Sequence, residues 1–160
     1  MKITRVEYDN RRRAFLVSAS NKNLYLFPYS MLALAPSHNN PIERVYVDKD
    51  LAEKGFTYVL KAGKEDSVLL DQVLEYNQDP NYLVRMLRHS LTVHALAILK
   101  GSSISKREVI RRMKTTPTQF YRLIDLRFEN KSLDQMVKLL AALDCPIEIA
   151  FPRKGRRRAA

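Results

Sequence analysis

The sequence predicts an α+β protein, with a small antiparallel-sheet domain at the N-terminus followed by an all-α domain. Short runs rich in β-branched and aromatic residues, separated by polar breaks, fill the first 60 positions. From Pro80 onward the apolar residues instead recur at spacings of three and four, the period of a helix. We therefore expect a sheet-rich domain over residues 1–78, a helical domain over residues 79–151 and a basic disordered tail over residues 152–160.

Positive charge is concentrated in the second half of the chain. The 160 residues carry a formal net charge of +11. Residues 91–160 hold 15 Lys and Arg against six Asp and Glu, a net +9, whereas residues 1–90 hold 13 against 11, a net +2. Clustered Lys and Arg attract polyanions through counterion release, which makes nucleic acid a candidate partner of the second half. A merely solvated basic surface is the alternative.

Other features of the sequence argue against a membrane protein and against an enzyme. No stretch approaches the roughly 20 apolar residues that span a bilayer, and the first residues lack the apolar run of a secretory leader, so we expect a cytoplasmic protein. Cys145 is the single cysteine and has no partner for an internal disulfide. The three histidines and four glycines form no metal-ligand or phosphate-loop pattern, and we predict no catalytic residue, metal or cofactor. Acidic residues between 66 and 79 are explained by helix starts more simply than by a cation site.

The strand runs expected in the first half are residues 5–8, 14–19, 24–27, 42–47 and 56–60. Residues 67–77 fit either the end of a sheet or a helical turn. Asp79 followed by Pro80 is a helix start, because Asp caps the first turn and Pro fits its first position. That helix either continues to Gly101 or is interrupted by a second helix that begins near Leu91.

Two short, capped helices are expected next. Ser105 is an N-cap, and Glu108 three residues later completes a capping box. Thr116 and Pro117 start the following helix and end the previous one, because Pro disfavours helical geometry in the residue before it. About three residues therefore separate the two helices. Ser132 caps a further helix, whose apolar residues continue to position 143.

The second short helix has one apolar and one polar face. Phe120, Leu123 and Ile124 share one face and are expected to pack inward. The remaining positions carry side chains that suit DNA, namely Thr118, Gln119, Tyr121 and Arg122. Gln pairs with adenine and Arg with guanine through two hydrogen bonds each, Thr binds either a base edge or a phosphate, and Tyr binds a phosphate oxygen. The alternative is a helical core whose polar residues are only solvated.

Residues 91–145 resemble the lambda-repressor-like (Cro/repressor, Xre-type) helix-turn-helix family. The resemblance is carried by SISKREVIRRMKTTPTQFYRLID and, after a loop, KSLDQMVKLLAALD. It implies a transcriptional regulator that binds duplex DNA. It further implies that Ser105 and Lys106 touch phosphate, that residues 116–122 read bases, and that Ser132 approaches the DNA backbone.

The predicted DNA-binding residues are Ser105, Lys106, Thr116, Thr118, Gln119, Tyr121 and Arg122. Further candidate phosphate contacts are Arg112, Lys114, Lys131, Ser132, Arg156 and Arg157. Two positions depart from the family pattern. Ile110 replaces a small alanine and is expected to push the helices apart, and Lys114 replaces a turn glycine, so it must either adopt a left-handed conformation or belong to a different turn. These departures motivate an alternative, a protein-interaction module such as an antitoxin-like subunit.

The N-terminal half is similar to a small sheet-rich bacterial domain of unknown function that is sometimes joined to an Xre-type domain. The similarity is carried by LYLFPYSML and VYVDKDLAEKGFTYVLKAG. Residues 147–151 alternate apolar and polar and are expected to form a strand that docks on the N-terminal sheet or pairs with a second subunit. The five basic residues between 153 and 158 are either a DNA-contacting arm or a solubilising tail. Besides duplex DNA, the sequence leaves open a homodimer and a protein partner of the N-terminal domain.

Overall fold

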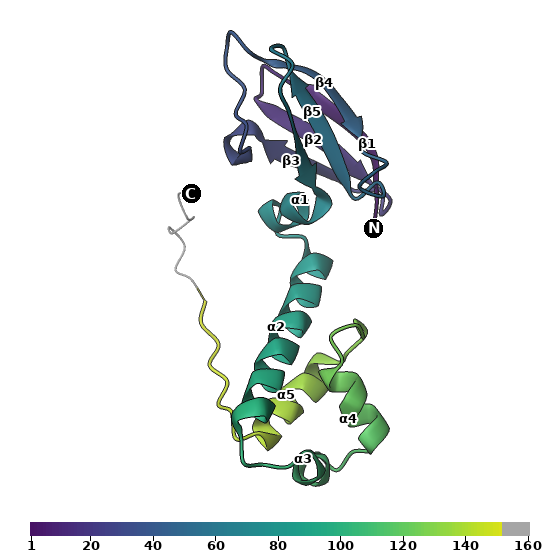
Figure 1. The fold of residues 1–160 in the computed structure, drawn as a ribbon, viewed down its shortest axis with the longest axis vertical. Helices are drawn as coiled ribbons and strands as arrows, with labels where there is room; N and C mark the ends of the chain where they lie inside the picture. The colour runs from purple at the N-terminus through teal and green to yellow at the C-terminus, as the bar shows by residue number, and fades with distance from the viewer. Residues whose placement is uncertain (152–160) are drawn as a thin grey trace. The chain divides into compact units, whose positions relative to one another are not determined.

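The computed structural model describes residues 1–151 and divides the chain into two compact units, Met1–Leu83 and a second unit that begins at Val84. The described residues form two three-stranded antiparallel sheets and five α-helices. The α+β class is therefore as predicted, with all the strands in the first unit (Figure 1). The units are described separately.

Each sheet of the first unit is a three-stranded meander, in which consecutive strands pair. The first sheet has the order β1 (Ile3–Asp9), β2 (Ala14–Ala19), β3 (Leu24–Pro28), and the second has the order β4 (Ile42–Val47), β5 (Gly55–Leu60), β6 (Glu65–Leu69). All five predicted strand runs are confirmed. The stretch that the sequence left open contains both alternatives, because β6 ends at Leu69 and α1 (Leu70–Tyr76) begins at the next residue.

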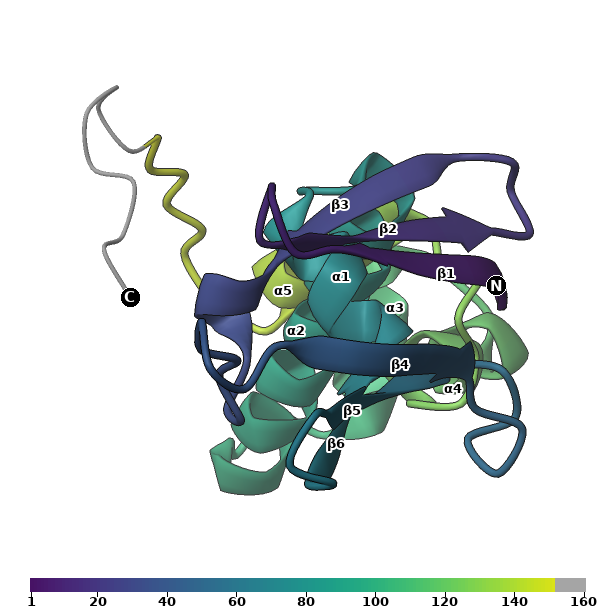
Figure 2. The ribbon, with the colours of Figure 1, turned by 90° about the horizontal axis from the view of Figure 1, so that it is seen from above.

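The two sheets share one aromatic core. Phe15 is fully buried, and its ring centroid lies 4.8–5.5 Å from those of Tyr29, Phe56 and Tyr58. Strands β1 and β4 run along neighbouring edges of the sheets (Figure 2). There the Tyr8 hydroxyl donates to the carbonyl oxygen of Glu43 at 3.0 Å. Tilted and edge-to-face contacts among aromatic rings of β2, β5 and the segment that holds Tyr29 thus join the two meanders into one unit.

Helix α2 (Pro80–Gly101) is continuous, which settles the alternative of a break near Leu91. Its start is as predicted, because Asp79 accepts a hydrogen bond from the backbone N–H of Tyr82 at 3.0 Å. Tyr82 is 9% exposed and belongs to the core of the first unit. The boundary between the units therefore lies after Leu83 and not after residue 78, since the first turn of α2 packs with the sheets.

The second unit packs α3 (Lys106–Met113), α4 (Pro117–Ile124) and α5 (Leu133–Ala142) against the remainder of α2. Its core cluster is apolar, and the fully buried members are Ala95, Val109, Phe120, Met136, Leu139 and Leu140, while Thr92 and Lys131 are buried polar residues of the same unit. The strand expected over 147–151 is wrong, because residues 145–151 have no regular secondary structure. An extended segment needs the hydrogen bonds of a neighbouring strand, and alternation alone does not provide one.

Candidate nucleic-acid interface

Hydroxyl caps fix the starts of the three short helices. The Ser105 hydroxyl accepts from the Glu108 N–H at 3.2 Å, and the Thr116 hydroxyl accepts from the Gln119 N–H at 3.2 Å. Ser132 does the same for α5, at 3.4 Å. All three predicted caps are therefore confirmed. The capping box is not, because the Glu108 side chain accepts hydrogen bonds from arginines later in α3.

The connection between α3 and α4 resolves both departures from the family pattern. Lys114 has φ 51° and ψ 46°, so it adopts the left-handed conformation that a turn glycine would supply. Its backbone N–H donates to the Arg111 carbonyl oxygen at 3.1 Å, which closes the end of α3. Ile110 is half-buried and packs against the core of the unit. The fold thus accommodates both residues, with about three residues between the helices as expected.

Helix α4 presents its polar face to solvent. Phe120 is fully buried and Leu123 is 6% exposed, with Ile124 packed beside them, as predicted. The four polar positions are all exposed, namely Thr118, Gln119, Tyr121 and Arg122. The arrangement leaves their side chains open to a ligand over the first two turns of the helix.

Several of these polar groups are held by neighbours. The Thr115 hydroxyl donates to Gln119 Oε1 at 2.7 Å, which fixes the amide of Gln119 and leaves its NH₂ group free to donate. Lys106 Nζ lies 5.5 Å from the centroid of the Tyr121 ring. This cation–π contact joins the start of α3 to the middle of α4. Tyr121 therefore supports Lys106 as well as being a candidate contact of its own.

The described part of the second unit carries an excess of positive charge. Residues 84–151 contain 12 Lys and Arg against six Asp and Glu, a net +6. Hydrogen bonds from Arg111 and Arg112 hold the pKa of Glu108 at about 2, and a hydrogen bond from Arg127 lowers the pKa of Asp125. These acids remain ionised but are already engaged by arginines. The basic side chains that these acids do not engage include those of Lys106, Arg107, Lys114 and Arg122, all of which are exposed.

Two of the predicted phosphate contacts have other roles in the folded unit. Lys131 is 4% exposed, and its ammonium donates to the hydroxyl of Thr92 at 2.8 Å. Burial lowers the pKa of this lysine. Since its ammonium is enclosed, we withdraw Lys131 as a phosphate contact. Arg156 and Arg157 lie outside the described residues.

Arg112 is the second such residue. Its guanidinium donates to the carboxylates of Glu108 at 3.0 Å and Asp144 at 2.9 Å, and to the carbonyl oxygen of Ala142 at 3.1 Å. These hydrogen bonds of Arg112 link α3 to the end of α5. Arg107 was not among the predicted phosphate contacts, although its side chain is exposed. It lies on α3, two positions before the buried Val109. Helical periodicity was the available signal, because a spacing of two residues places side chains on nearly opposite faces.

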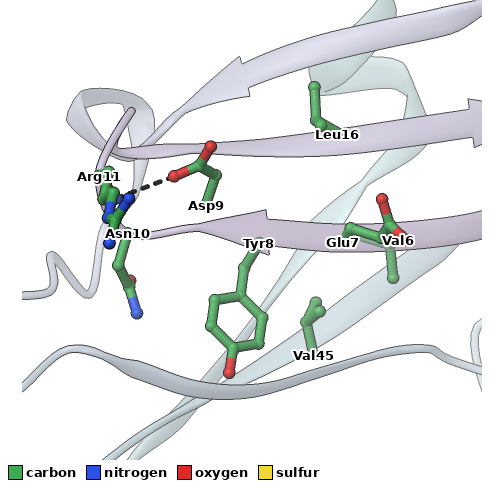
Figure 3. A pocket seen from close by; sticks show the side chains of 8 residues that line it. All are labelled: Val6, Glu7, Tyr8, Asp9, Asn10, Arg11, Leu16 and Val45. Atoms are coloured by element: carbon green, nitrogen blue, oxygen red, sulfur yellow. Dashed lines mark hydrogen bonds between the residues drawn. The ribbon is translucent and has the colours of Figure 1, made fainter.

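The first unit has a shallow open groove along β1, with a volume of about 690 Å³ (Figure 3). Both of its acidic groups are engaged, because Asp9 accepts from the backbone N–H groups of Arg11 and Arg12 at 2.9 and 3.0 Å and Glu7 accepts from the guanidinium of Arg5. The amide of Asn10 donates to the carbonyl oxygen of Ile42 at 3.0 Å and accepts from the Tyr29 hydroxyl at 3.1 Å. Asp9 thus closes the β1–β2 turn, and Asn10 links this turn to β4 and to Tyr29, so the groove offers little free polar chemistry to a ligand.

Within residues 1–151, no three His, Cys, Asp or Glu side chains gather as metal ligands. The same residues include no helix of sufficient length and apolarity to cross a membrane. Comparison with protein-family models, curated proteins and solved structures gives no match to this chain. The interpretation of the interface therefore depends on its own geometry.

Proposed function

We propose that the second unit is a helix-turn-helix domain that binds duplex DNA, and that the chain is a transcriptional regulator. The observation that carries the proposal is the two-sided character of α4, whose buried Phe120 and Leu123 fix a helix with exposed Gln119 and Arg122 on its outer side. An exposed α-helix of this kind fits the major groove, where its N-terminal residues meet base edges.

The interface residues divide into base-reading and phosphate-binding groups. Gln119 and Arg122 are the base readers, for adenine and guanine respectively. The side chains with access to phosphates are those of Ser105, Lys106, Lys114, Thr116, Thr118, Tyr121 and Ser132. Phosphate contacts set the orientation of the domain on the duplex, while base contacts set its specificity.

The main argument for the alternative, a protein-interaction module, no longer holds. It rested on Ile110 and Lys114, and both residues are accommodated between α3 and α4 without displacing either helix from the core. We therefore retain DNA binding as the proposed function.

Fluorescence anisotropy of the full chain with a random-sequence duplex pool at low salt tests the proposal. Binding is expected, and the best duplex selected from the pool should lose at least tenfold affinity for the double variant Gln119→Ala, Arg122→Ala, because a bidentate base contact contributes about 1–3 kcal/mol. Lys138→Ala, an exposed basic position on α5, is the control. No binding to any duplex, or equal binding by the double variant and the control, overturns the proposal.

A further inference from the structure

An exposed aromatic residue, Phe128, lies beside the proposed base reader Arg122. Phe128 belongs to the loop between α4 and α5 and is 37% exposed. The guanidinium carbon of Arg122 lies over its ring, 6.0 Å from the centroid, which is within the range of a cation–π contact. Phe128 is outside the core cluster of the second unit. Its ring therefore contacts the polar side of α4 and not the core.

A short turn places Phe128 there. Its backbone N–H donates to the carbonyl oxygen of Asp125 at 3.1 Å, the bond that closes a four-residue β-turn. The Asp125 carboxylate accepts from the backbone N–H of Arg127 at 2.9 Å, as Asp commonly does at the start of a turn. The Arg127 guanidinium donates to the same carboxylate at 3.2 Å. These local bonds begin at the residue after α4 and return Phe128 to the last turn of that helix.

Arg122 differs from several other arginines of the second unit in what it contacts. Arg111, Arg112 and Arg127 each donate to a carboxylate. Among the described residues, Arg122 forms no ion pair and no side-chain hydrogen bond, and it contacts the Phe128 ring instead. Contact with a ring face engages the charge of a guanidinium and leaves its N–H donors unpaired. Arg122 is therefore held by a neighbour while it keeps the donors that guanine O6 and N7 accept.

We propose that Phe128 is a positioning residue for base recognition, which holds Arg122 in the orientation that reads guanine. The inference rests on the DNA binding proposed above and adds a determinant of its specificity that lies outside α4. An unrestrained arginine side chain loses rotamer freedom when it binds a base, and a contact already present in the unbound protein removes part of this cost. A held guanidinium is also less able to turn to another base or to a phosphate, so the ring favours guanine over competing acceptors.

A purely structural role of Phe128 predicts a different result. If the ring only stabilises the loop, its removal should weaken binding to every duplex by the same factor. If the ring positions Arg122, its removal should lower the preference for guanine at one base pair. The ratio of the affinities for two duplexes that differ only at that base pair separates the two roles.

Anisotropy titrations of the full chain with two duplexes measure this ratio. The first duplex is the best sequence selected from the random pool, and the second has A·T in place of the G·C pair at which Arg122→Ala loses its preference. Phe128→Leu should lower the preference for the first duplex about two- to fivefold, the factor that an exposed cation–π contact supplies. Phe128→Tyr keeps an aromatic ring and should keep the preference. Leu126→Ala, at an exposed position of the same loop, is the matched control and should leave the preference unchanged.

The contact itself is measurable without DNA. The ring current of Phe128 should shift the NMR resonance of the Arg122 Nε–H group in the free chain. Phe128→Leu should remove this shift, whereas Phe128→Tyr should keep it. The Tm of both variants should stay close to that of the wild-type chain, because Phe128 is outside the core cluster.

Failure of this inference is distinguishable from failure of DNA binding. A wild-type chain that binds no duplex contradicts both. If the chain binds but has no guanine preference that depends on Arg122, or if Phe128→Leu keeps that preference or weakens binding to both duplexes equally, DNA binding stands and the role of Phe128 is wrong. Equal loss of the preference in Phe128→Leu and Phe128→Tyr also contradicts this role, because the aromatic ring would then not be its cause.

Discussion

The hydroxyl of Tyr25 donates a hydrogen bond of 2.9 Å to Asp79 Oδ2, and the other oxygen of this carboxylate accepts from the backbone N–H of Tyr82 at 3.0 Å. Asp79 is 5% exposed. A single buried carboxylate therefore connects β3 of the first sheet to the first turn of α2, although Tyr25 and Asp79 are 54 residues apart in sequence.

Replacing this carboxylate should destabilise the first unit. Asp79→Ala removes the N-cap of α2 and the acceptor of the Tyr25 hydroxyl, so we expect the free energy of unfolding to fall by about 1–3 kcal/mol. Urea denaturation followed by circular dichroism measures the change. Asp50→Ala, at an exposed position in the same unit, is the control and should change the stability by less than about 0.5 kcal/mol. Equal effects of the two substitutions would show that Asp79 does not connect β3 to α2.

The pH dependence of stability should report the arginine contacts of Glu108. Hydrogen bonds from Arg111 and Arg112 hold the pKa of Glu108 at about 2, below its ordinary value of 4.5. The unfolded chain therefore binds the proton more readily than the folded one, so the stabilising contribution of Glu108 is present above about pH 4.5 and is lost as the pH falls towards 2.

The variant Glu108→Gln lacks this contribution at every pH. The difference in Tm between the wild-type chain and Glu108→Gln should thus shrink between pH 6 and pH 3 in thermal melts. Glu148→Gln, an exposed position in the same unit, provides the comparison for the general effect of acid. A Tm difference that stays constant over this range would mean that the arginines do not hold the carboxylate in solution.

Local chemistry explains what the sequence predicts well. The caps at Ser105, Thr116 and Ser132 depend on a hydroxyl and a backbone N–H three residues later, so each is readable from a short window. The same holds for the buried side of α4, because Phe120 and Leu123 follow the helical period. Strand runs in the first unit are recognisable from their β-branched and aromatic content for the same reason.

The features that could not be predicted from the sequence depend on contacts between residues that are distant in the chain. The buried ammonium of Lys131 donates a hydrogen bond to Thr92, which lies 39 residues earlier in the sequence. The guanidinium of Arg112 donates to the carboxylate of Asp144, 32 residues later. No pattern of spacing encodes either pair. Alternation in 147–151 likewise shows that these residues are able to form a strand, but a strand also needs an edge to pair with, and that depends on the rest of the fold.

The buried pair of Lys131 and Thr92 predicts an asymmetry between two substitutions. Thr92→Val removes the hydroxyl and leaves an enclosed ammonium without this acceptor, which should cost about 1–3 kcal/mol of unfolding free energy. Lys131→Met removes the charge together with its need for an acceptor and keeps much of the volume, so we expect a smaller loss or a gain. Chemical denaturation of both variants, with Lys138→Met on the exposed side of α5 as control, decides the point. A greater loss for Lys131→Met contradicts this view of the pair.

The left-handed backbone of Lys114 predicts a stabilising substitution. A residue with a side chain is strained at φ 51°, so Lys114→Gly should raise the unfolding free energy by up to about 1 kcal/mol. Arg111→Gly, which places glycine inside α3, should instead lower it by about 1 kcal/mol. Thermal denaturation separates these opposite signs. Because Lys114 is also a proposed phosphate contact, Lys114→Gly should bind DNA more weakly while it melts at a higher temperature, and destabilisation by this variant would contradict the assigned turn.

The salt dependence of DNA binding should distinguish exposed from buried lysines. Lys106 is exposed at the start of α3, beside the Tyr121 ring, and its proposed role is to neutralise one phosphate. Lys106→Ala should therefore reduce the magnitude of the slope of log K against log salt concentration by about 1, since each neutralised phosphate releases about 0.9 counterion. Lys131→Met removes the same formal charge from a site enclosed against Thr92 and should leave the slope unchanged. Anisotropy titrations of the wild-type chain and both variants over a range of salt concentrations measure the slopes. Equal reductions in the two variants would mean that the slope follows net charge alone, and the assignment of Lys106 to the interface would then fail.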